Sequence, residues 1–119
     1  MISLECDAGE GVERKVEYLT LSDGSQPFVE WFENLDKHAR ARVNATIDKA
    51  QRGVRSVLRN LRDGVCEIKV NFGPGYRVYY GEDGDKIILL ISGGDKRKQT
   101  GDIETVKAYW RAYEKNKKL

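Results

Sequence analysis

Cysteine, histidine and proline are scarce in this sequence. It contains two cysteines, two prolines and one histidine. Cys6 and Cys66 belong to no Cys-x-x-Cys pair and lie far along the chain from His38, so their spacing excludes a disulfide framework and a recognisable metal-ligand motif. We therefore expect two reduced thiols, no bound metal and no cofactor.

Long apolar runs are absent as well. No stretch of about 18 apolar residues is present, and residues 1–12 have neither the basic start nor the apolar core of a signal peptide. We therefore expect a cytoplasmic protein with no membrane partner. The length suits one domain, with residues 1–12 as a flexible lead-in and residues 13–119 as a single folded unit.

Charge is unevenly distributed, although the formal net charge is only +2. Residues 1–35 are acidic, whereas residues 36–63 and 96–119 each contain eight basic and three acidic residues. If these two basic blocks meet in space, they form a positive surface that suits a polyanion or an acidic protein partner. Either block alone is more typical of a solvated helix face.

The stretch from residue 67 to residue 95 predicts three short strands. Apolar and polar residues alternate in the first two strands, as in a sheet that buries one face. Residues 73–75, with two glycines around a proline, and residues 82–85, with an Asp-Gly pair, predict the connecting turns. The third strand, residues 86–92, is apolar on both sides and needs cover on both faces, or at least a central position in the sheet.

This alternation predicts which side chains share a face. Glu67 and Lys69 lie on one face of the first strand, and Arg77 and Tyr79 lie on one face of the second. Lys69 and Arg77 are therefore expected on one exposed face. Tyr79 beside them is placed either to stack on a nucleic-acid base or to pack in the sheet. Glu67 is either a general base or, more typically, half of a structural ion pair.

Helical patterns flank these strands. Residues 12–21 predict an initial strand, residues 28–35 a short amphipathic helix, residues 37–52 a second helix, and residues 101–117 a final helix. Residues 54–63 suit either a further helical turn or a loop. The predicted order is β-α-α-β-β-β-α, an α+β fold whose antiparallel meander carries the helices on one face.

Three segments together resemble a known family. They are FVEWFENLDKHARARV (Phe28–Val43), EIKVNFGPGYRVYY (Glu67–Tyr80) and ILLISGGDKRKQTGDIETVKAY (Ile88–Tyr109). In this order the sequence resembles the RelE/ParE/HigB superfamily of bacterial toxin–antitoxin systems, and in particular the addiction module killer proteins. The resemblance implies a RelE-like fold, in which a small antiparallel or mixed sheet carries an N-terminal helical hairpin and a C-terminal helix.

The resemblance also implies a function. RelE-like members are ribosome-dependent endoribonucleases that cut mRNA, ParE-like members poison DNA gyrase, and a cognate antitoxin protein silences both. Similarity to the killer proteins implies the first branch, with the ribosome, mRNA and an antitoxin as partners. Cleavage would proceed by attack of a 2′-hydroxyl without a metal. A gyrase-poisoning toxin and a non-catalytic, phage-borne or plasmid-borne binding protein are the alternatives.

The resemblance implies a catalytic set of three cations. Arg77 matches the arginine of the family's GPGYR motif, Lys69 the basic position of its E-L-R strand motif, and Lys96 the lysine of GGDK. Arginine and lysine suit the binding of phosphate and the stabilisation of charge that develops on it. The further residues expected to contact RNA are Arg40, Arg42, Tyr79, Arg97 and Lys98.

Overall fold

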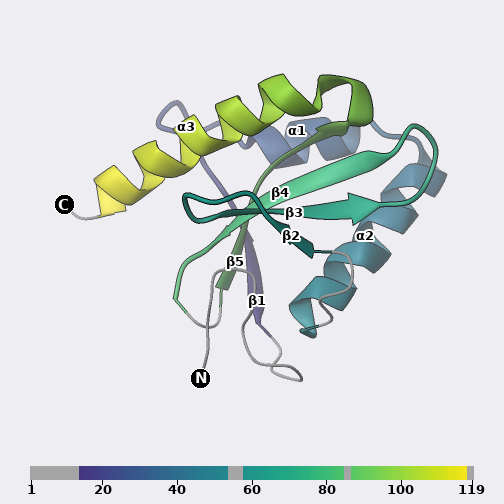
Figure 1. The fold of residues 1–119 in the computed structure, drawn as a ribbon, viewed down its shortest axis with the longest axis horizontal. Coiled ribbons are helices and arrows are strands. Elements are labelled where there is room, and N and C mark those ends of the chain that lie inside the picture. The colour runs from purple at the N-terminus through teal and green to yellow at the C-terminus, as the bar shows by residue number, and fades with distance from the viewer. Residues whose placement is uncertain (1–13, 54–57, 85–86, 118–119) are drawn as a thin grey trace.

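The computed structural model describes residues 14–53, 58–84 and 87–117 (Figure 1). The expected lead-in, residues 1–12, lies outside them. The elements are β1 (Lys15–Tyr18), α1 (Pro27–Glu33), α2 (Lys37–Gln51), β2 (Leu58–Asn60), β3 (Val65–Val70), β4 (Tyr76–Glu82), β5 (Ile87–Asp95), the 3-10 helix η1 (Lys96–Lys98) and α3 (Gln99–Lys117).

All five strands form one mixed sheet in the order β1-β5-β4-β3-β2. β1 lies parallel to β5, and the remaining neighbours are antiparallel. A parallel pair needs a crossover connection: here α1 and α2 carry the chain from β1 to β2 at the opposite edge of the sheet, and the antiparallel strands β2, β3 and β4 lead back to β5 beside β1. The predicted α+β class with a mixed sheet, a helical hairpin and a C-terminal helix is confirmed.

Local signals set the boundaries of the two N-terminal helices. Pro27 occupies the first turn of α1, where its missing N–H costs no helical hydrogen bond. Asp36 caps α2, and its side chain accepts a hydrogen bond from the N–H of Ala39 at 2.8 Å. Gly53 follows α2 with a φ of +90°, so the predicted glycine stop is confirmed.

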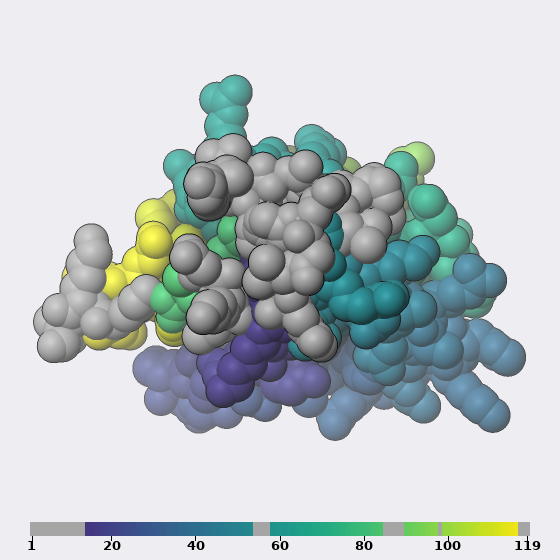
Figure 2. Space-filling view, turned by 90° about the horizontal axis from the view of Figure 1, so that it is seen from below, coloured from purple at the N-terminus to yellow at the C-terminus, as the bar shows by residue number. Residues whose placement is uncertain are grey.

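Helices cover both faces of the sheet, which corrects the expectation of helices on one face. One core cluster joins α1 and α2 to the sheet through residues such as Phe28, Val43 and Ile68. A second cluster joins α3 to the opposite face through Val106 and Trp110. Figure 2 shows the end of α3, in yellow, and α2, in blue, on two sides of β1. Burial on both faces is what the apolar β5 requires.

β2 is an element that the sequence left undecided. It pairs antiparallel with β3 and places Leu58 opposite Ile68. The turn to β3 has positive φ at Arg62, Asp63 and Gly64. A three-residue edge strand is too short to show a period in the sequence. Residues 54–57, which belong to the same undecided stretch 54–63, lie outside the described residues.

Cys66 lies fully buried on the α1–α2 face of the sheet. It is disulfide-bonded and is not a free thiol, so the expectation of a reduced thiol at this position was wrong. Cys6 lies outside the described residues. Among the helices that the structure describes, none combines the length and the apolar character that crossing a membrane requires.

Candidate functional site

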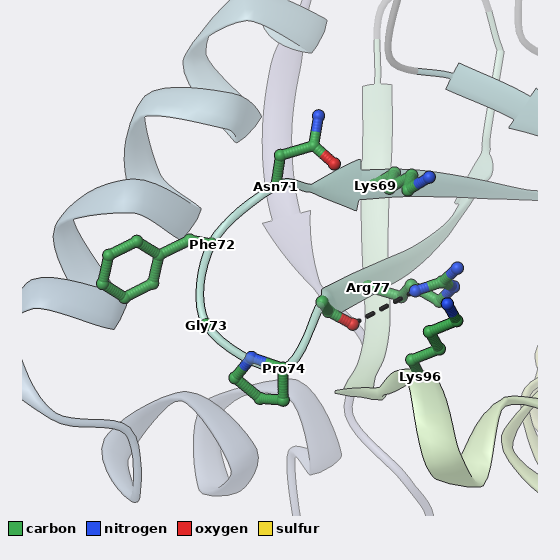
Figure 3. A pocket seen from close by; sticks show the side chains of 8 residues that line it. Lys69, Asn71, Phe72, Gly73, Pro74, Arg77 and Lys96 are labelled. Carbon is green, nitrogen blue, oxygen red and sulfur yellow. Dashed lines mark hydrogen bonds between the residues drawn. The ribbon is translucent and has the colours of Figure 1, made fainter.

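A pocket of about 480 Å³ opens where β3 turns into β4, beside η1 (Figure 3). It brings together side chains from two separate stretches of the chain, residues 69–77 and Lys96. The lining residues are Lys69, Asn71, Phe72, Gly73, Pro74, Gly75, Arg77 and Lys96. The three cations that the sequence singled out therefore share one pocket, and these lining residues include no carboxylate and no histidine.

Lys69 and Arg77 are direct cross-strand neighbours on β3 and β4. Like charges in directly opposed positions destabilise a sheet, so this pairing has a local cost. Lys69 is exposed, and within the described residues neither it nor Lys96 forms an ion pair with a carboxylate. Repulsion between like charges that is retained at the mouth of a pocket is typical of a site that binds a ligand of the opposite charge.

Arg77 is buried, which corrects the expectation that it stands on an exposed face. Its residue is 6% exposed. Its Nε lies 3.3 Å from Oε2 of Glu67, an ion pair without hydrogen-bond geometry. Its Nη1 donates a hydrogen bond to the carbonyl of Gly75 at 3.1 Å (Figure 3). Two contacts thus hold the guanidinium at the pocket wall.

Glu67 lies beneath the pocket and is 2% exposed. Its Oε2 accepts a hydrogen bond from Nε2 of Gln99 at 2.6 Å. Its Oε1 lies 3.5 Å from Nη1 of Arg59, so the carboxylate is surrounded by three partners. The structural ion pair, the more typical of the two interpretations of Glu67, is the arrangement found.

Lys96 begins η1 and reaches the pocket from the end of β5. In Figure 3 its amine points toward the guanidinium of Arg77. Asp95 caps η1 by accepting a hydrogen bond from the N–H of Arg97 at 3.0 Å, and it also pairs with the Arg97 guanidinium at 3.3 Å. Arg97 is exposed beside the pocket. The side chain of Lys98 lies outside the described residues.

The two arginines of α2 are separated by the structure. Arg42 lies over the ring of Phe72, a pocket residue, with its guanidinium carbon 5.2 Å from the ring centre. Arg40 instead donates to the carbonyl of Leu35 at 2.9 Å and lines a different cavity, near Tyr18. Arg42 therefore extends the positive pocket onto α2, and Arg40 does not.

Tyr79 is fully buried beneath α3, which corrects its expected place on an RNA-contacting surface. It shares a face with Arg77, as the alternation predicted, but α3 covers that part of the face. Burial, followed by the charges of Glu67 and Asp102, raises the pKa of Tyr79 well above its usual value. With no open ring face, it packs the core.

Sequence reasoning missed three residues that shape this site. Asn71 shares the period-2 face of Lys69 and was detectable from that pattern alone. Phe72 supports Arg42, and Gln99 reaches Glu67 from the first position of α3. No local pattern indicates these two contacts, because each joins segments far apart in the chain.

Residues 30–117 match the family described as Phage derived protein Gp49-like (DUF891), a range that includes the whole pocket. A protein of Haemophilus influenzae, named only as an uncharacterized protein, is 35% identical over 81 residues, which cover 67% of this chain and 82% of that protein. The chain therefore belongs to the phage-derived Gp49-like family, a family of the addiction-module, toxin–antitoxin group.

Proposed function

We propose that this chain is the toxin of a bacterial type II toxin–antitoxin pair, and that it cuts mRNA on the ribosome. The proposal places it in the wider RelE/ParE/HigB superfamily, with which its α+β fold is compatible. The observation that carries the proposal is the convergence of Lys69, Arg77 and Lys96 in one pocket whose lining residues include no acid.

The pocket suits a phosphate group. Arg77 offers a planar fork of donors that is already held in place, which suits a clamp on the two oxygens of the scissile phosphate. Lys69 and Lys96 are exposed, flexible amines that add charge as the phosphorane forms. Positive side chains thereby supply the electrostatic stabilisation that strand cleavage requires.

The cleavage step needs a proton acceptor and a proton donor. The 2′-hydroxyl attacks the adjacent phosphate, gives up its proton, and the 5′-oxygen leaves with a proton. Glu67 is occupied by its three partners, so we assign both proton transfers to the pocket lysines: one, as the neutral amine, accepts the 2′-hydroxyl proton, and the other, as the ammonium, donates a proton to the leaving 5′-oxygen. Arg42 above Phe72 continues the positive track along which the RNA backbone would run.

A translating extract tests this proposal. Purified wild-type protein should produce new 5′ ends in mRNA, mapped by primer extension, and Arg77→Ala should lower the cleavage rate at least about a hundredfold. Because Arg77→Ala removes one of the three partners of the buried Glu67 carboxylate and can lower stability, Lys96→Ala, at an exposed position, is a second variant that keeps the fold. Arg111→Ala is the matched control, since exposed Arg111 lies 12 positions after Gln99, about 18 Å along α3.

The translating extract, a gyrase assay on plasmid DNA and a growth test on induction together separate the rival functions. Intact mRNA with blocked translation would overturn the nuclease assignment. Linear plasmid DNA trapped with gyrase, and no RNA ends, would identify a gyrase-poisoning toxin. Normal growth on induction of a folded protein would identify a non-catalytic binding relative.

An antitoxin partner follows from the same proposal. A positive pocket with Arg42 and Arg97 at its edges suits an acidic segment of the antitoxin as well as RNA. Co-expression with the neighbouring reading frame should then restore growth. Continued growth arrest despite a stable complex would contradict neutralisation at this surface.

A further inference from the structure

Glu67 is a buried carboxylate between the pocket cation Arg77 and the helix α3. It is the diagonal cross-strand neighbour of Arg77, because Glu67 itself pairs with Tyr79. A buried ion is costly unless it is well paired, and an arginine that is only 6% exposed needs such a partner. Glu67 is the carboxylate found beside the Arg77 guanidinium, with the two atoms 3.3 Å apart.

Glu67 is itself fixed from a third segment. The amide of Gln99, the first residue of α3, donates to the same Oε2 that faces Arg77. The carboxylate therefore cannot turn away without losing its bond to α3. Glu67 fixes one end of the guanidinium, the Gly75 carbonyl fixes another, and the remaining N–H groups are directed to the pocket that Arg77 lines.

Charge and geometry give opposite expectations for the removal of this carboxylate. Glu67 lowers the positive potential of the pocket, so its loss should strengthen the attraction of any polyanion. The same loss frees the Arg77 guanidinium, which opposes cleavage, because a misplaced group stabilises the transition state poorly. A role limited to charge and a role in positioning can therefore be separated by experiment.

We propose that Glu67 is a positioning residue that holds the guanidinium of Arg77 at the pocket, with Gln99 locking Glu67 from α3. The expected effect of Glu67 on the rate of cleavage rests on the proposed RNA-cleaving function. The structural part of the proposal concerns the orientation of Arg77 and stands independently of any activity.

Glu67→Gln tests the kinetic consequence, because it removes the charge and keeps the shape. Cleavage of mRNA on stalled ribosomes is measured as the protein concentration rises. We expect the maximal rate to fall by about tenfold or more, while the half-saturating concentration stays equal or falls. Asp63→Asn is the control, since it removes one exposed carboxylate, which pairs with the partly buried Lys107 outside the pocket lining, and it should leave both quantities unchanged.

A double-mutant cycle shows whether Glu67 acts through Arg77. If it does, adding Glu67→Gln to Arg77→Ala lowers the rate no further than Arg77→Ala alone. Independent, multiplying losses would overturn the proposal. So would a rate for Glu67→Gln equal to that of the wild type. Thermal unfolding of each variant separates these outcomes from loss of the fold.

The NMR signal of the Arg77 Nε–H group tests positioning without any cleavage. It is assigned by its absence from the spectrum of Arg77→Lys. In the full-length wild-type protein this proton should exchange slowly with water, and Glu67→Gln should speed the exchange by about fivefold or more. Unchanged exchange overturns the proposal. Faster exchange in a protein that cuts no RNA upholds the positioning role and rejects the nuclease function.

Discussion

Arg77 combines an unfavourable placement in the sheet with a proposed role in binding an anion. Its charge is buried, and Lys69 stands directly opposite it on the neighbouring strand. The sheet tolerates this pair because Glu67, on β3, lies diagonally across from Arg77, and its negative charge balances one of the two positive charges. The remaining positive charge faces the pocket, where an anion would balance it.

Tyr113 provides a pH test at the same scale. Its hydroxyl donates to Oδ2 of Asp83, and burial followed by this hydrogen bond raises the pKa of Tyr113 to about 12. An unfolded tyrosine ionises near pH 10, roughly its reference value. The stabilising effect of Tyr113 is therefore complete below about pH 10 and is lost as the pH rises toward 12.

We expect Tyr113→Phe to lower the free energy of unfolding by about 1 kcal/mol at neutral pH, because one hydrogen bond is lost. The difference from the wild type should shrink above about pH 10. Urea unfolding at a series of pH values measures it. Tyr18→Phe, which alters an exposed tyrosine, is the control. If the wild type stays more stable than Tyr113→Phe by the same amount up to pH 12, the raised pKa of Tyr113 is contradicted.

At the scale of elements, each helical layer places a tryptophan on a glycine of the sheet. A Cβ built on Gly93 would collide with the ring of Trp31 from α1, and one on Gly81 would collide with Trp110 from α3. Both glycines have ordinary φ values, so close packing accounts for them and backbone strain does not. These contacts set the distance between each helix and the sheet.

Substitution of alanine for glycine should change the free energy of unfolding in opposite directions at Gly81 and Gly101. Gly81→Ala forces Trp110 and α3 away from the sheet, and we expect the free energy of unfolding to fall by about 1–3 kcal/mol. Gly101→Ala meets open space within α3, and we expect a gain of about 0.5 kcal/mol from the better helix former. Chemical denaturation of both variants measures these changes; a loss at both positions would refute the packing argument.

At the scale of the whole molecule, the two basic blocks of the sequence lie on different layers. Residues 36–63 include α2 on one face of the sheet, and residues 96–119 include α3 on the other. They approach each other at the end of the sheet, where Arg42 contacts a pocket residue and Lys96 enters the pocket. A polyanion bound there would meet both blocks at once.

Salt dependence checks this arrangement. We expect the affinity for a single-stranded RNA oligonucleotide to fall linearly with salt on a log–log scale. Lys69→Ala and Lys96→Ala should each reduce the slope by about 0.7, which corresponds to one phosphate contact. Lys115→Ala, at an exposed position near the end of α3, should leave the slope unchanged. Equal effects of all three variants would indicate general attraction instead of a pocket.

Most of the fold could be predicted from local patterns. The helical spacing that starts at Phe28, the glycine stop at Gly53 and the alternation around Ile68 each act over a few residues, and each appears at the predicted place. The three-residue β2 and the placement of α3 on the second face could not be predicted. A short edge strand has no period, and an amphipathic helix does not specify which face it covers.

The sequence by itself determined the alternation of side chains along each strand, from which Lys69 and Arg77 are expected on one face. The register of β3 and β4 decided that they stand directly opposite each other. The sequence also placed Lys96 just after the last strand. Only the tertiary structure decided that Lys96 reaches Arg77, that α3 covers Tyr79, and that Glu67 and Gln99 hold the guanidinium. These contacts join segments distant in the chain, and their geometry depends on how the helices pack on the sheet.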